Sequence, residues 1–253
     1  MKMMIFIYSY LLVLGLVLGS FYNVVGLRVP EGQSIVRPRS HCPTCKRTLT
    51  ALDLVPVLSF VFLKGACRGC GSKISPFYPI MELATGLLFM LAFYQFGLTG
   101  ELLVALTLIS LLVIIFVSDM KYMIIPDKVL LFFLPLFFLE RLFIPLNPWW
   151  DPLVGAFFGF GLLLLIAVIS KGGMGGGDIK LFFVIGLALG FSQTLLTFLM
   201  ATFLGAVFGV GGMMLGKHKR KELIPFGPFI AVGALLSYFY GEDIIGWYFS
   251  MFM

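Results

Sequence analysis

Long apolar runs recur along almost the whole of this 253-residue chain. A helix needs roughly 20 apolar residues to cross the hydrocarbon core of a bilayer. Eight runs approach or exceed that length, and 179–191 is the shortest of them. They cover approximately 4–27, 78–98, 101–118, 129–145, 152–170, 179–191, 193–216 and 225–241. Only 12% of the residues are charged, against about 25% in soluble domains. The sequence therefore predicts an all-α polytopic membrane protein with about eight transmembrane helices.

The basic residues predict how these helices are oriented. Lys2 precedes the first run, but that run is too long for a signal peptide and lacks a cleavage site, so we expect a retained helix. All other lysines and arginines except Arg141 lie in or beside four loops that eight crossings place on one side. These loops are 28–77, 119–128, 171–178 and 217–224. The positive-inside rule makes that side cytoplasmic and puts both termini outside. The net charge of +6 is then a topology signal, and no nucleic-acid partner is expected because no basic stripe stands free of the membrane.

The segment 28–77 contains every cysteine of the chain, spaced as Cys42-x2-Cys45 and Cys67-x2-Cys70. This spacing is typical of two knuckles around a tetrahedral zinc ion. The alternative is four buried or disulfide-bonded cysteines, but disulfides rarely persist in a reducing cytoplasm. Four sulfur ligands leave no open coordination position, so the metal is expected to be structural. A segment of this size with little apolar core needs such a staple.

Four carboxylates lie in or beside the apolar runs, where carboxylates are costly and often functional: Glu82, Asp119, Asp127 and Asp178. The three aspartates all fall at the predicted cytoplasmic ends of their helices, so two of them from different helices can meet. A solvated helix end or an N-cap is the simpler alternative for each aspartate. For Glu82, orientation of a substrate amine and support of the fold both stay open.

Two neighbouring carboxylates can hydrolyse a peptide bond. One keeps a proton and polarises the carbonyl, while the other activates water; the pair titrates as a unit, so neither role is assigned to one residue. The glycine-rich run before Asp178 suits close approach by an extended substrate, although a flexible loop explains it equally. The only histidines, His41 and His218, lie in loops, which excludes an H-E-x-x-H metal site or a Ser-His pair within the membrane.

Several motifs in sequence order resemble those of the type IV prepilin peptidases, a branch of the GxGD membrane aspartic peptidases. They are Gly19-Ser20-Phe21 with Asn23, Val24, Arg28 and Pro30; Arg39-Ser40-His41-Cys42-Pro43-x-Cys45; Gly65-Ala66-Cys67-Arg68-Gly69-Cys70; Ile74-Ser75-x-x-Tyr78-Pro79-x-x-Glu82; Asp119 with Ile125-Pro126-Asp127; and Gly175-Gly176-Gly177-Asp178-x-Lys180. The resemblance covers nearly the whole chain.

The resemblance implies a bacterial inner-membrane enzyme that cuts the basic leader from prepilins or type II secretion pseudopilins at the cytoplasmic face. Its catalytic aspartates match Asp119 and Asp178, with supporting residues at Gly175, Gly177, Asp127, Glu82 and Lys180. Long members also methylate the new N-terminus with S-adenosylmethionine, an activity linked to the zinc-bearing insertion. The implied organisation is a first helix at 1–27, a zinc-binding, methyltransferase-associated insertion at 28–77 and a peptidase domain at 78–253.

Three alternatives stay open from the sequence. The enzyme is a peptidase only, or the chain is an ion-coupled transporter whose carboxylates carry protons, or it is a scaffold that binds pilin-like helices without cutting them. The cysteine loop and the single glycine break at the membrane edge argue against a transporter, because transporters commonly show paired broken helices near the midplane.

Overall fold

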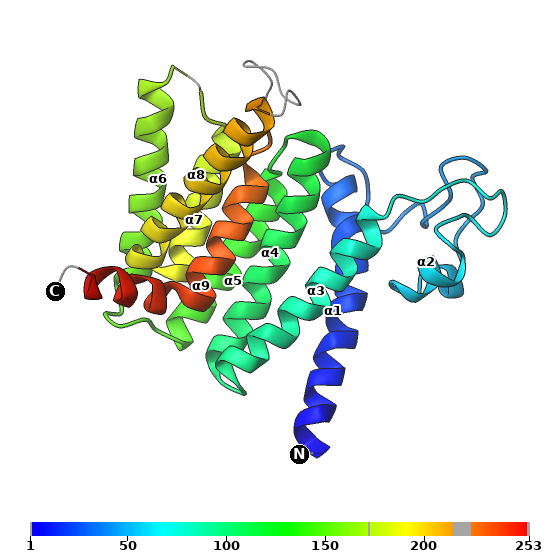
Figure 1. Ribbon diagram of the computed structural model, residues 1–253, viewed down its shortest axis with the longest axis horizontal. Coiled ribbons are helices and arrows are strands. Elements are labelled where there is room, and N and C mark those ends of the chain that lie inside the picture. Colours follow the sequence, from blue (N-terminus) through cyan, green and yellow to red (C-terminus); the bar gives the residue numbers. More distant parts are fainter. Residues whose placement is uncertain (1, 172, 215–223, 252–253) are drawn as a thin grey trace. The chain divides into compact units, whose positions relative to one another are not determined.

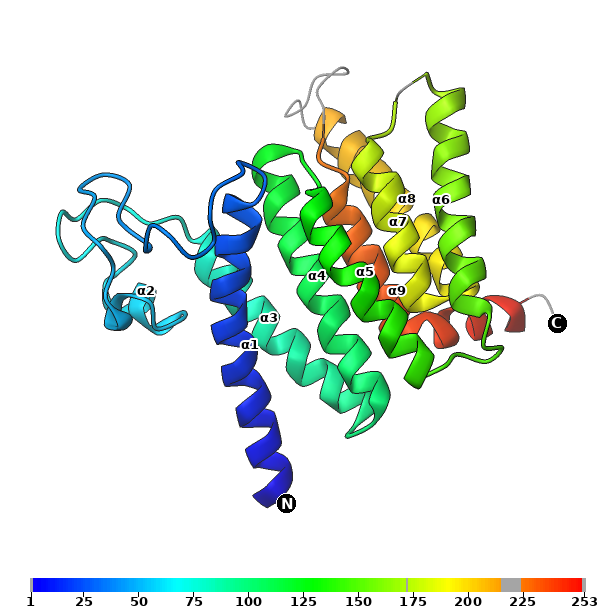
Figure 2. The same cartoon turned by 180° about the vertical axis from the view of Figure 1, so that it is seen from behind.

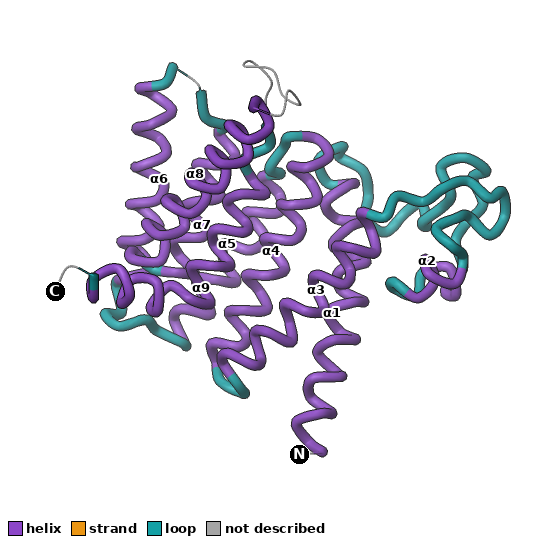
Figure 3. The backbone as a smooth tube through the Cα atoms, in the orientation of Figure 1, coloured by secondary structure: helices purple, strands orange, loops and turns teal. Residues whose placement is uncertain are grey.

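A computed structural model describes residues 2–171, 173–214 and 224–251. Within these ranges the chain forms helices and loops only, apart from two isolated bridge pairs, His41 with Thr48 and Ala66 with Lys73 (Figure 3). The all-α prediction is therefore confirmed for the described part of the chain. The elements in chain order are α1 (Lys2–Arg28), the 3-10 helix η1 (Ala51–Asp53), α2 (Leu58–Phe62), α3 (Phe77–Phe96), α4 (Gly100–Tyr122), α5 (Asp127–Phe143), α6 (Asp151–Ile169), α7 (Gly176–Leu189), α8 (Phe191–Met214) and α9 (Gly227–Ser250).

Each of the eight predicted apolar runs contains a helix, but only six helices in the described ranges are both long and apolar enough to cross a membrane. These are α1, α3, α4, α6, α8 and α9. Helix α5 has 17 residues and carries Asp127, Lys128, Glu140 and Arg141. Helix α7 has 14 residues, which is about 21 Å of helix against a hydrocarbon core of about 30 Å. The structure thus gives six candidate spans where the sequence predicted about eight.

The chain divides into two compact units, residues 1–117 and 118–253. In the first unit, α1 packs along α3 (Figure 1), and glycines allow the two backbones to approach. A methyl carbon added to Gly15 would lie 2.7 Å from the Cα atom of Gly86, and one added to Gly19 would lie 2.9 Å from the Cα atom of Glu82. Small residues at such crossings replace side-chain packing by direct backbone contact, as is common between membrane helices.

In the second unit, α7 is the central helix and contacts α5, α6, α8 and α9 (Figure 2). Nearly every residue from Ile179 to Leu189 is buried. Because neighbouring helices cover α7, its length need not match the thickness of the bilayer.

Two buried or half-buried charged groups hold the far end of this helix. Arg141 of α5 donates to the carbonyl oxygen of Ala188 (2.7 Å), and Asp151 of α6 accepts the Phe191 N–H (3.2 Å). The first satisfies a carbonyl at the end of α7 and the second an amide at the start of α8, both of which lack a partner within their own helix. These charges therefore serve the fold at the helix ends.

Candidate functional site

Asp119 lies one turn before the end of α4 and is 6% exposed. Its Oδ2 accepts the backbone N–H of Gly227 at 2.8 Å, where α9 begins. A methyl carbon added to Gly227 would lie 2.8 Å from the same oxygen, so only glycine fits without displacing the carboxylate. The N-terminus of α9 thus presents to Asp119 an amide that has no partner within its own helix, together with the positive end of the helix dipole.

Asp178 lies in the first turn of α7, where two glycines shape its surroundings. The N–H of Gly175 donates to its carboxylate, and a methyl carbon added to Gly175 would lie 2.8 Å from Oδ2. A methyl carbon added to Gly177 would lie 2.8 Å from the Cβ atom of Ile125. Ile125 belongs to the turn between α4 and α5, so the contact at Gly177 brings the start of α7 against the residues that follow Asp119.

This arrangement places the carboxylates of Asp119 and Asp178 near enough to repel each other electrostatically. They come from different helices, and both belong to the second unit. Two adjacent carboxylates cannot both ionise comfortably, and a shared proton gives one of them acid and the other base character. The structure thus puts the two predicted aspartates within electrostatic range of each other in the second unit, and their catalytic role stays a prediction.

Asp127 and Lys180, two predicted supporting residues, form an ion pair. The Nζ atom of Lys180 donates to both carboxylate oxygens of Asp127 at 2.7 and 2.9 Å, and both side chains are more than half exposed. The pair joins the start of α5 to the start of α7. Asp127 therefore makes a contact between two helices at the surface.

The four cysteines lie on two turns with the same backbone pattern. In each, the first cysteine accepts the N–H four residues later and donates to the carbonyl five residues later: Lys46 and Arg47 for Cys42, Gly71 and Ser72 for Cys67. All four sulfur atoms lie within 4.8 Å of one another. The Sγ atoms of Cys42 and Cys70 are 3.8 Å apart, and those of Cys45 and Cys67 are 4.0 Å apart.

This geometry fits a metal ion. A tetrahedral zinc site with Zn–S bonds of about 2.3 Å places its sulfur atoms about 3.8 Å apart. The backbone N–H of Cys45 donates to the Cys42 sulfur and is the main reason why the pKa of Cys42 falls to about 5, whereas desolvation and the neighbouring thiols raise the pKa of Cys45 to about 11. The thiolate is the form that binds metals.

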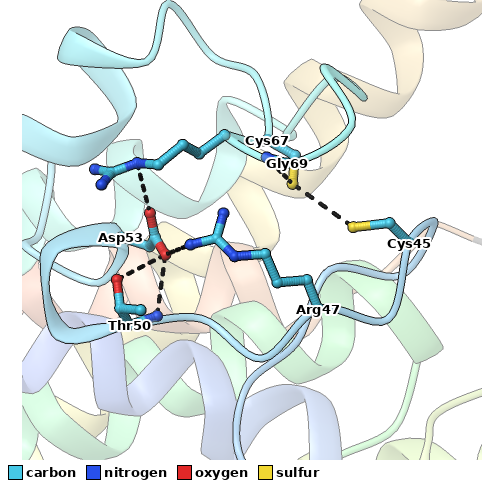
Figure 4. A network of polar contacts seen from close by, with 7 residues as sticks. Cys45, Arg47, Thr50, Asp53, Cys67 and Gly69 are labelled. Atoms are coloured by element: carbon cyan, nitrogen blue, oxygen red, sulfur yellow. Dashed lines mark hydrogen bonds and ion pairs between the residues drawn. The ribbon is translucent and has the colours of Figure 1, made fainter.

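Asp53 links the two knuckles (Figure 4). Its side chain is 4% exposed and forms ion pairs with Arg47 (2.6 Å) and Arg68 (3.1 Å). Arg47 follows the first knuckle, and Arg68 lies within the second. The backbone N–H and the hydroxyl of Thr50 also donate to it. These Thr50 donors, assisted by the two arginines, hold the pKa of Asp53 below its usual value.

Glu82 lies in the first unit and accepts the backbone N–H of Val57 at 2.8 Å. Among the histidines, His41 is exposed and bonds the Arg39 carbonyl through Nδ1 (3.1 Å). His218 lies outside the described residues, as does almost all of the predicted loop 217–224. The sequence reasoning missed Gly227, although a glycine followed by proline at the start of a helix is a recognisable signal of a helix N-terminus.

Comparison with known proteins covers most of the chain. Residues 13–96 match the profile of the Bacterial Peptidase A24 N-terminal domain, and residues 106–210 match that of the Type IV leader peptidase family. The chain is 46% identical to a prepilin leader peptidase/N-methyltransferase of Bacillus subtilis, over 96% of this chain and 98% of that protein. A protein of the same name from Aeromonas salmonicida is 33% identical over 96% and 94%, and one from Myxococcus xanthus is 39% identical over 79% and 62%. No solved structure matches the chain.

Proposed function

Because this chain belongs to the type IV leader peptidase family, we propose that it cleaves the leader from prepilins or pseudopilins and then methylates the new N-terminus. Asp119 and Asp178 form the proposed peptidase dyad. The observation that supports this assignment is the electrostatic interaction between these two carboxylates, from α4 and α7, with Gly175, Gly177 and Gly227 close to them. The glycines allow the protein's own backbone to lie close to the two carboxylates and to Ile125.

Hydrolysis by this pair follows from one shared proton. The ionised carboxylate takes a proton from a water molecule as the water attacks the scissile carbonyl, and the protonated carboxylate donates to the carbonyl oxygen. The N–H of Gly227 holds one oxygen of Asp119 in place, so this carboxylate is oriented before substrate arrives. Collapse of the tetrahedral intermediate breaks the C–N bond, and the leaving amine takes a proton from the pair.

A cleavage assay with purified protein, a prepilin and detergent tests this proposal. We expect a shortened product from the wild-type protein and none from Asp119→Asn or Asp178→Asn, because either change removes a carboxylate from the dyad. Cleavage that continues in either variant would defeat the assigned pair. A wild-type protein that binds prepilin without cutting it would support a scaffold instead, and ion-coupled transport without cleavage would support a transporter.

The proposed second activity is methyl transfer to the amine that cleavage exposes. S-adenosylmethionine, the donor implied by the relatives' name, would supply an electrophilic methyl group. The insertion 28–77 is the segment that we associate with this activity, and 78–253 is the proposed peptidase domain. Mass spectrometry of the cleaved pilin is the test. A product without the added methyl group would make the chain a peptidase only.

We also propose zinc as the ion held by Cys42, Cys45, Cys67 and Cys70, because their sulfur spacing suits its tetrahedral thiolate geometry. Metal analysis should find about one equivalent in the wild-type protein and a loss in Cys42→Ser and Cys67→Ser. A folded wild-type protein without metal would contradict this.

Eight crossings remain the proposed topology, with the dyad and the cysteine knuckles on the cytoplasmic side of the bacterial inner membrane. The Asp127–Lys180 ion pair supports this, because it holds the starts of α5 and α7 together. Helix α6 is a candidate span. If α6 crosses and α5 does not, the start of α7 lies on the opposite face from the start of α5. The ion pair therefore favours an α5 that crosses as well.

A further inference from the structure

A cavity of about 510 Å³ lies in the first unit, between the ends of α1 and α3 and the cysteine knuckles. Its wall includes the side chains of Leu27, Leu54, Phe60 and Ile74, with polar groups from Asn23, Lys73 and Glu82. Small-molecule sites typically have volumes of about 300–1,000 Å³, mostly apolar walls and a few placed polar groups. The cavity has these properties, and the peptidase mechanism makes no use of it.

Asn23 contributes an acceptor without a donor. Its Nδ2 donates to the carbonyl oxygen of Tyr78 at 3.2 Å, which fixes the orientation of the amide. Its Oδ1 is buried and receives no hydrogen bond from any residue that the structure describes. A buried acceptor left unpaired costs about 1–3 kcal/mol. A ligand that brings an N–H or O–H group to this cavity would remove that cost.

Glu82 contributes a carboxylate without a cation. It is 9% exposed and accepts the N–H of Val57 (2.8 Å), with the Ser20 hydroxyl also bonded to it. Within the described ranges no lysine or arginine forms an ion pair with it. Arg28 also lines the cavity, but its guanidinium donates hydrogen bonds to the carbonyl oxygens of Ser34 and Pro38. A buried carboxylate is costly unless a cation compensates it, so the cavity favours a cationic ligand.

We propose that this cavity is the binding site for S-adenosylmethionine, with Glu82 and Asn23 as its polar anchors. This inference rests on the methyl transfer proposed above. The ligand has a sulfonium and an ammonium group for Glu82, several N–H and O–H donors for Asn23, and a carboxylate for Lys73. Its adenine ring suits the apolar wall.

The cysteine knuckles form part of the wall of this cavity. Cys42 and Cys67 both line the cavity, and both are buried. Nearby Asp53 lines it too, held by Arg47 and Arg68. A metal that fixes the two knuckles would therefore fix one wall of the ligand site.

Calorimetric titration of S-adenosylmethionine into the full-length protein in detergent is the test. We expect Glu82→Gln and Asn23→Leu each to weaken binding at least about tenfold, because each removes a buried polar contact to the ligand. Glu31→Gln is the matched control, since Glu31 is an exposed carboxylate of the same unit that does not line the cavity, and it should bind as the wild type does. Variants are compared only if their thermal midpoints without ligand stay within a few degrees of the wild type.

A second measurement needs no variant. Bound S-adenosylmethionine should slow amide hydrogen exchange in residues 54–63 and 73–82 of the wild-type protein and leave residues 144–151 unchanged. Protection at the first two segments supports the site. Binding without any change there overturns it.

The outcomes separate this inference from the methyl transfer itself. If the wild type binds the donor and methylates, but both variants bind it equally well, the site is wrong and methyl transfer stands. If the variants bind the donor normally and lose only methylation, the cavity serves the amine, which also overturns the proposal. If the wild type cleaves prepilin yet neither binds the donor nor methylates, the methyl transfer is wrong, and this site with it.

Discussion

At the residue scale, three glycines control the space around the two aspartates. Gly175 and Gly227 each lie so close to a carboxylate that a methyl carbon would sit 2.8 Å from its oxygen, and Gly177 lies equally close to Ile125. The aspartates supply the proposed chemistry, but these glycines decide where the carboxylates lie. The glycines before Asp178 are thus required because a side chain at Gly175 or Gly177 would collide with neighbouring atoms, as well as for the freedom of their backbone.

The effect of a methyl group at Gly177 is the first prediction. Gly177→Ala should reduce kcat/KM for prepilin cleavage about 100-fold, because displacement of α7 from Ile125 moves Asp178 relative to Asp119. Gly176→Ala is a matched control one residue away, since nothing lies within 4 Å of a methyl carbon there. Equal activity in the two variants would contradict the packing argument. Cleavage rates at several prepilin concentrations are the measurement.

The Asp53 ion pairs lead to a prediction about the metal. Asp53→Asn should weaken metal retention about tenfold or more, because Arg47 and Arg68 lose the carboxylate that holds the two knuckles in register. Competition with a chelator measures this directly. Asp243→Asn, in the exposed part of α9, is the control. Unaltered retention in Asp53→Asn would show that the knuckles do not depend on this link.

At the scale of elements, glycines allow helix backbones to touch. Where α6 crosses α7, a methyl carbon on Gly155 would lie 2.6 Å from the carbonyl oxygen of Gly186 and 2.5 Å from the carbonyl carbon of Gly190. Backbone atoms cannot move aside as a flexible side chain can. The position of the C-terminal half of α7 therefore depends on small residues far from the aspartates.

Gly155→Ala should lower the stability of the protein in detergent by about 1–3 kcal/mol, the usual cost of an overpacked contact. On the same helix, Gly161 has open space around it, and Gly161→Ala should be neutral or slightly stabilising because alanine favours the helix by about 1 kcal/mol. Thermal or denaturant unfolding distinguishes the two. A Gly155→Ala protein as stable as the wild type would disprove the close crossing.

At the scale of the whole molecule, topology decides whether the dyad and the cysteine knuckles face the same compartment. The proposed eight crossings would put the loop between α5 and α6 outside and the four native cysteines inside. A membrane-impermeant maleimide should therefore label Trp149→Cys in intact cells and leave the wild-type protein unlabelled until the cells are opened. Trp149 is 69% exposed, so access to the residue itself is not limiting. Labelling of Trp149→Cys only in opened cells would reverse the topology of α5.

Much of the fold follows from the sequence by itself. Apolar runs gave a helix in every predicted segment because the backbone within a bilayer must satisfy its own hydrogen bonds. The cysteine spacing gave the knuckles because the spacing of each pair is local. The two aspartates could be singled out as candidates because a carboxylate beside an apolar run is costly and therefore conspicuous.

Only the tertiary structure decided how those pieces meet. It placed the N–H of Gly227 on Asp119, paired Asp127 with Lys180, and put Asp53 between the two knuckles. In the described part of the chain it also leaves six helices long and apolar enough to span a membrane, because α5 and α7 have only 17 and 14 residues. Most of these contacts join residues that lie far apart in the sequence, and a local sequence pattern does not encode such contacts. The apolar runs that first defined the protein fix which segments are helices, and packing between them fixes the site.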